Sequence, residues 1–136
     1  MPMGTTIIIL FVILFLLFDL LIIFRFIFRE REFSKEFVEE IKRNLEKIKD
    51  HSLEKQIFEY EKILELCLKM KKIKGNTLGE KIKSYKNMFL NKNSLWQAHK
   101  LRNKIAHEIG FNPSQKELEM SSKTLRREIC NLIENS

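Results

Sequence analysis

Proline and glycine are scarce in this chain, and segments of β-strand character are missing. The 136 residues include two prolines and four glycines, and no proline occurs between Met3 and Asn112. No segment alternates apolar and polar residues with a period of two, which argues against a β-sheet. Apolar residues nevertheless recur regularly, which argues against disorder. The sequence therefore predicts an all-α fold.

Cysteine is equally scarce, and several catalytic signatures are missing. Cys67 and Cys130 lie far apart in helical patterns, which fits neither a disulfide framework nor a zinc site but suits a reducing compartment. The sequence has no phosphate-binding glycine loop, no paired carboxylates in an apolar setting and no nucleophile beside an evident base. We therefore expect neither a metal nor a cofactor.

Charge and apolar residues are distributed unevenly along the chain. The formal net charge is +7, but the three arginines and three acidic residues in residues 1–32 cancel each other. The other 104 residues, with 22 basic and 15 acidic side chains, carry the whole excess. Six of the eleven phenylalanines lie before residue 30. The chain thus joins an apolar leader to a basic body, and its single strong apolar run argues against a polytopic membrane protein.

The leader is predicted to be a transmembrane anchor over residues 1–30. Between Ile7 and Phe24 the only polar residue is Asp19, and a helix continued to Phe28 would be about 33 Å long, enough to cross a bilayer. A cleaved signal peptide would need a basic segment before the apolar run and small residues after it. Neither is present, so we expect the span to be retained.

The flanks of the anchor predict its orientation. No lysine or arginine precedes Ile7, whereas Arg25, Arg29 and Arg31 lie at or just after the end of the run. By the positive-inside rule, the C-terminal body lies in the cytoplasm and the protein is a single-pass protein of the cell membrane. Asp19 could mark a function within the membrane, but a structural account is favoured: protonation, pairing in a helix dimer, or proximity to Arg25.

The body predicts a small antiparallel helical bundle. We expect residues 31–52 to form an amphipathic helix that continues from the anchor. Residues 53–136 are expected to form the bundle core, which begins with a long helix that ends near Gly75. Three capping boxes predict the later helix starts. They are Thr77 with Glu80, for a helix to about Leu90, Ser94 with Gln97, for a helix to about Ile109, and Ser114 with Glu117.

The segment from 94 to 110 carries the most suggestive polar residues. His99, Asn103 and His107 recur with a spacing of four and share one side of a helix, while Arg102 falls within the apolar arc. Arg102 would either pair with a glutamate of a neighbouring helix or lie in a groove open to an anion. The histidines could exchange protons near neutral pH, or they could simply connect helix ends. The residues by themselves favour the structural accounts.

The string Arg102-Asn103-Lys104-Ile105-Ala106-His107 resembles the motif of HEPN domains (higher eukaryotes and prokaryotes nucleotide-binding), in which an arginine, a polar residue and spacers precede a histidine. The resemblance extends over roughly residues 35–134 and implies a HEPN-like bundle. It implies homodimers whose two motifs face one cleft, and metal-independent cleavage of RNA. His107 would then assist proton transfer, Arg102 would hold the scissile phosphate, and Asn103 would orient either group. His99 and Trp96 would support the cleft.

The last two expectations concern a lysine-rich segment that could contact phosphates and an alternative to the ribonuclease function. Residues 69–92 contain eight lysines and one acidic residue, and the candidate contacts to RNA or lipid phosphate are Lys71, Lys72, Lys74, Lys81 and Lys83. A solvated face or contact with anionic lipid head groups is favoured over RNA binding. The alternative to a ribonuclease is a non-catalytic, membrane-tethered helical module that binds a protein or a nucleotide.

Overall fold

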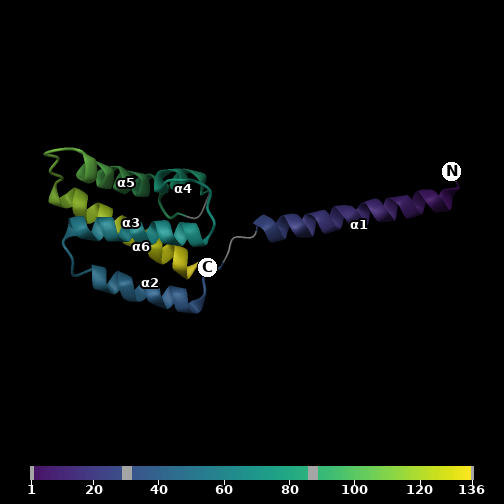
Figure 1. The fold of residues 1–136 in the computed structure, drawn as a ribbon, viewed down its shortest axis with the longest axis horizontal. Coiled ribbons are helices and arrows are strands. Elements are labelled where there is room, and N and C mark those ends of the chain that lie inside the picture. Colours follow the sequence, from purple (N-terminus) through teal and green to yellow (C-terminus); the bar gives the residue numbers. More distant parts are fainter. Residues whose placement is uncertain (1, 29–31, 86–88, 136) are drawn as a thin grey trace. The chain divides into compact units, whose positions relative to one another are not determined.

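The computed structural model describes residues 2–28, 32–85 and 89–135, which form six helices and no strand. The all-α prediction is therefore confirmed. The helices are α1 (Met3–Phe28), α2 (Lys35–Ile48), α3 (Leu53–Met70), α4 (Leu78–Ser84), α5 (Lys92–His107) and α6 (Gln115–Glu134) (Figure 1). The chain divides into two compact units, Met1–Glu30 and Arg31–Ser136.

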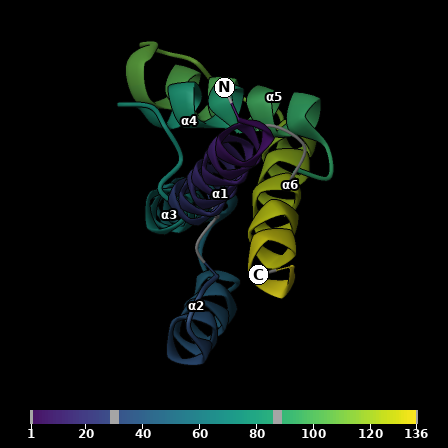
Figure 2. The ribbon, with the colours of Figure 1, turned by 90° about the vertical axis from the view of Figure 1, so that its right-hand side faces the viewer.

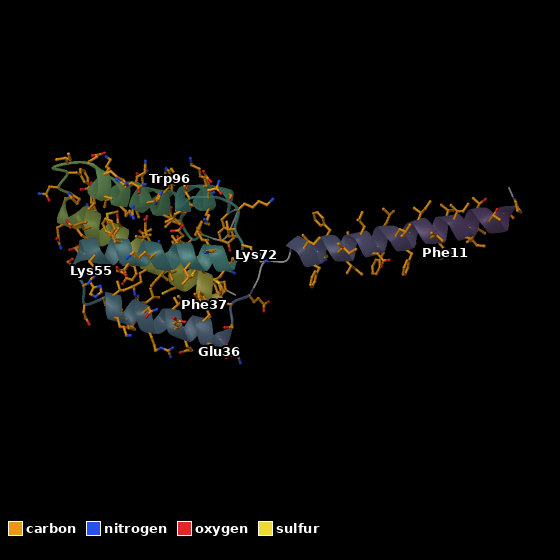
Figure 3. All side chains as sticks on the ribbon, in the orientation of Figure 1. Phe11, Glu36, Phe37, Lys55, Lys72 and Trp96 are labelled. Atoms are coloured by element: carbon orange, nitrogen blue, oxygen red, sulfur yellow. The ribbon has the colours of Figure 1, made fainter. Side chains whose placement is uncertain are left out.

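The first unit is the apolar helix α1. Its large apolar side chains, from Ile7 to Ile27, are all exposed, and Figure 3 shows them, Phe11 among them, projecting around the helix. A helix that is apolar on every side has no polar face to turn toward water. The helix is long and apolar enough to cross a membrane, as the sequence predicts.

The described residues of the second unit form a bundle of five helices in three layers. Helix α6 lies beside α3 in the middle layer, with α5 and α4 on one side and α2 on the other (Figures 1 and 2). The long helices α2, α3, α5 and α6 alternate in direction along the chain (Figure 1), as short connections require. The fully buried apolar side chains include Ile57, Leu64, Cys67, Leu68, Ile82, Leu95, Leu125, Ile129 and Leu132.

Helix α2 is separate from α1, contrary to the predicted continuous helix. Residues 32–34 are not helical, and the Ser34 hydroxyl accepts a hydrogen bond from the Phe37 N–H at 3.2 Å, which caps a new helix start. Ile41, Leu45 and Ile48 are buried, and α2 packs against α3. The amphipathic helix therefore belongs to the bundle.

Two of the three predicted helix caps are confirmed. The Thr77 hydroxyl accepts the Glu80 N–H at 3.2 Å, although the Glu80 carboxylate accepts from Asn76 rather than from Thr77. At the start of α6, Ser114 and Glu117 form the complete reciprocal box. The Ser114 hydroxyl and backbone N–H both bond the Glu117 carboxylate and hold its pKa below the usual range.

The third predicted cap, at Ser94, is wrong. Helix α5 begins at Lys92, and the side chain of Asn91 caps it by accepting the Ser94 N–H at 2.9 Å. The reason is tertiary. The fully buried Glu128 of α6 accepts the backbone N–H groups of Leu90 and Asn91 at 2.9 and 2.7 Å, which fixes where the chain turns into α5.

The other predicted boundaries differ by a few residues. Helix α4 ends at Ser84 rather than near Leu90, although the predicted extension includes residues 86–88, which lie outside the described residues. Helices α3 and α5 end at Met70 and His107, a few residues ahead of the predicted ends near Gly75 and Ile109. Gly75 has a φ of 138°, and a Cβ there would lie 2.7 Å from the Lys81 backbone nitrogen, so the turn between α3 and α4 requires glycine.

Candidate functional site

A buried carboxylate lies where α3 and α5 meet. Glu61 of α3 is 5% exposed, and its two oxygens contact two side chains of α5. The Nδ1 atom of His99 lies 2.8 Å from Oε1, and the Nε atom of Arg102 lies 3.2 Å from Oε2. The Arg102 contact is an ion pair whose N–H is not aligned as a hydrogen bond. A buried carboxylate needs such partners.

Asn103 links the same two side chains on α5. Its Oδ1 atom accepts a hydrogen bond from Nη1 of Arg102 at 3.3 Å, and its Nδ2 atom lies 3.2 Å from Nε2 of His99. If the amide nitrogen donates to Nε2, the proton on the imidazole sits on Nδ1 and points to Glu61. Glu61, His99, Arg102 and Asn103 therefore form one network, which we call the Glu61 network.

The side chain of Arg102 is only partly enclosed. Its Cζ atom lies 4.8 Å from the centroid of the Phe58 ring, and its side chain remains 30% exposed. The structure thus supplies the glutamate of a neighbouring helix that one sequence account required. It also leaves part of the Arg102 side chain open to solvent.

Gly79 of α4 packs directly on His99. A Cβ at this position would lie 3.2 Å from Nε2 of His99 and 3.4 Å from Cζ3 of Trp96. The ring centroids of Trp96 and His99 are 5.5 Å apart. Helices α3, α4 and α5 therefore hold His99 on three sides. His99 and Trp96, which were expected from the sequence to support the cleft, are therefore neighbours.

His107 lies outside the Glu61 network. It is the last residue of α5, one helical turn beyond Asn103, and it is exposed. The predicted site residues thus divide into two groups: Arg102 and Asn103 contact each other and Asn103 also contacts His99, whereas His107 faces solvent at the helix end.

Sequence reasoning missed Glu61, although a signal was present. On α3, Glu61 lies four residues after Ile57 and three before Leu64. It therefore falls on the same face of the helix as these buried apolar residues and Leu68. A lone acid inside the apolar stripe of a helix requires a buried partner. That signal, set beside the arginine in the apolar arc of α5, could have predicted the ion pair.

The five candidate phosphate-binding lysines do not share one environment. Lys71 is 5% exposed, with its ammonium 4.7 Å from the centroid of the Phe33 ring. Lys81 is 8% exposed and lies 4.0 Å from Glu65. Lys72, Lys74 and Lys83 are exposed. Only these last three present their side chains to a large anion.

In the part of the chain that the structure describes, no three histidine, cysteine, aspartate or glutamate side chains come together as metal ligands. No protein-family model matches this chain, and neither a curated protein nor a solved structure matches it. The candidate site is therefore argued from its own residues.

Proposed function

We propose that this chain is a membrane-anchored, HEPN-like endoribonuclease that cuts cytoplasmic RNA without a metal. One observation supports the proposal beyond the sequence motif. Arg102 is held by the buried Glu61 while its side chain stays 30% exposed, and the next turn of α5 ends in the exposed His107. An arginine fixed by a buried acid presents its charge to a phosphate without ordering a free side chain.

In this proposal the chemistry is proton transfer and charge stabilisation. An imidazole that titrates near neutral pH can take the proton of a ribose 2′-OH and return a proton to the departing oxygen. His107 is the exposed imidazole of the motif. Arg102 offsets the charge that develops on the phosphate, and Asn103 steadies the guanidinium through its 3.3 Å contact.

The proposed enzyme acts as a homodimer at the inner face of the cell membrane. Arg102 and His107 are five residues apart, so they point in directions about 140° apart on one helix. Two copies of the motif facing each other would supply the arginine and the histidine to one phosphate. The anchor α1 places the bundle on the side that carries Arg25, Arg29 and Arg31.

A second candidate function follows from the same contacts. Glu61 pairs with both His99 and Arg102, and Asn103 bonds both, so the network can serve stability alone. The protein would then be a non-catalytic, membrane-tethered helical module that binds a protein or a nucleotide.

The decisive experiment uses the full chain purified in detergent micelles. The protein is incubated with mixed RNA in EDTA, beside the variants His107→Ala and Gln97→Ala. The second variant is the matched control, because Gln97 is also exposed on α5. We expect cuts that leave cyclic phosphate ends, and a rate lowered at least about 100-fold by His107→Ala. Both variants should keep the parent's helicity and thermal midpoint.

The opposite results are equally informative. A folded, dimeric parent that leaves RNA intact contradicts the nuclease and supports the binding module. Equal cleavage by the parent and His107→Ala contradicts the assigned base. A monomeric but active protein, measured by sedimentation, contradicts the shared cleft.

A further inference from the structure

A hollow of about 380 Å³ opens where α4 meets the start of α5. It is lined by Ile82, Lys83, Lys92, Asn93 and Trp96. The lining combines an aromatic ring, two cations and an amide. Glu61 and Arg102 do not line it, so the hollow is distinct from the Glu61 network.

The indole of Trp96 is firmly placed but not enclosed. It is half-buried, packs near Gly79, where a Cβ would lie 3.4 Å from Cζ3, and its ring lies 5.5 Å from that of His99. The Lys83 ammonium lies 4.8 Å from the indole centroid. Because Lys83 is exposed, its flexible side chain can leave the ring face to another flat group. Figure 3 labels Trp96 on the helix α5.

The second cation is held by backbone carbonyls. The ammonium of Lys92 donates a hydrogen bond to the carbonyl of Lys83 at 2.8 Å and lies 3.5 Å from that of Tyr85. These contacts place the charge at the end of α4, beside the hollow. An ammonium has three protons, so it can bind an anion while keeping these contacts.

From this arrangement we infer that the hollow binds one nucleotide of single-stranded RNA. The base stacks on Trp96, and the phosphate lies between Lys83 and Lys92. An aromatic platform needs an unpaired base, since the bases of a duplex already stack on each other. The inference deepens the proposed function, because it names the strand form of the substrate.

The hollow and the proposed cutting residue lie along one helix. Trp96 precedes Asn103 by seven residues and His107 by eleven, which places His107 about 16 Å further along α5 and on nearly the same side. A strand with one base on Trp96 would therefore reach His107 a few nucleotides away.

The test measures binding to a strand that cannot be cut. Trp96 is the single tryptophan of the chain, so the fluorescence of the full chain in zwitterionic micelles reports on this site alone. We expect 2′-O-methyl oligouridine to quench the emission saturably, and neither a duplex of the same length nor an abasic strand to do so. Binding of a labelled strand, followed by anisotropy, should weaken about tenfold in Trp96→Leu and stay close to the parent's in Trp96→Phe.

Lysine variants provide a second measurement if Trp96→Leu does not fold. Lys83→Gln should weaken binding several-fold and lower its salt dependence, whereas Lys123→Gln, at an exposed position of α6, should change neither. Equal binding by both lysine variants, or equal quenching by the abasic strand, overturns the inference.

The outcomes separate the inference from the proposed function. RNA cleavage without quenching would leave the nuclease standing and remove this site. Quenching that needs Lys83, without any cleavage, would support the site and remove the nuclease. Quenching of equal size by the duplex would contradict the preference for single strands.

Discussion

Glu61 of α3 and Arg102 of α5 form an ion pair across the bundle, with Oε2 and Nε 3.2 Å apart. The same carboxylate contacts His99 at 2.8 Å. One buried acid thus holds two of the polar side chains of α5 and, through them, Asn103. Two residues of the candidate motif, Arg102 and Asn103, are thus connected to a buried acid, whereas His107 is exposed.

Replacing Glu61 should therefore destabilise the bundle. Glu61→Gln keeps the shape but removes the charge that offsets Arg102, and we expect a loss of about 2–3 kcal/mol in the free energy of unfolding. Chemical denaturation of the full chain in micelles, followed by circular dichroism, measures this loss. Glu59→Gln is the matched control: Glu59 is on the same helix but 34% exposed and pairs with Lys62, which is 70% exposed, so its effect should stay below about 0.5 kcal/mol. Equal effects of the two variants would show that the network contributes little.

A methyl group at Gly79 should disturb the same network from α4. The added Cβ would lie 3.2 Å from Nε2 of His99, and His99 is held at both ring nitrogens. The gain in helix propensity, about 1 kcal/mol, is therefore outweighed, and we expect Gly79→Ala to be destabilising by about 1 kcal/mol net. Unfolding of Gly79→Ala, His99→Ala and the double variant completes a cycle. If the methyl group is as costly without the His99 ring as with it, the contact is not its cause.

Asn91, and not the predicted Ser94, caps the start of α5, a choice that the sequence alone could not make. Because the Asn91 side chain accepts the Ser94 N–H at 2.9 Å, Asn91→Ala should lower stability by about 1 kcal/mol. Ser94→Ala should change it by less than about 0.5 kcal/mol, since Ser94 lies within the first turn of the helix. Thermal and chemical unfolding of both variants measures the difference. A larger loss in Ser94→Ala would restore the predicted capping box.

The two cysteines should differ in reactivity. Burial raises the pKa of the Cys67 thiol to about 12, and burial also raises that of the half-buried Cys130. The thiolate is the reactive form, so at pH 8 the folded protein should react with iodoacetamide slowly at Cys130 and still more slowly at Cys67. Mass spectrometry of peptides after timed labelling measures both rates, with labelling in urea as the control. Equal native rates would contradict the buried position of Cys67.

Much of the fold could be predicted because helices and long apolar runs are encoded locally. The apolar run before Phe28, the spacing of apolar residues in α3 and the cap at Ser114 each depend on neighbours within a few positions. The break before α2 depended on Ser34, a local cap that the apolar periodicity obscured. The start of α5 was not predictable in this way because a distant residue sets it: the Glu128 carboxylate accepts a hydrogen bond from the Asn91 N–H.

The candidate site, like the fold, could be predicted from the sequence only in part. The sequence by itself determined which side chains of α5 share a face, because the helical repeat places residues four apart together. Only the tertiary structure decided their partners: it brought Glu61, 38 residues away, to His99, and it left His107 in solvent. The physical reason is that buried polar groups must find partners wherever packing brings them, and packing joins residues that no local pattern connects.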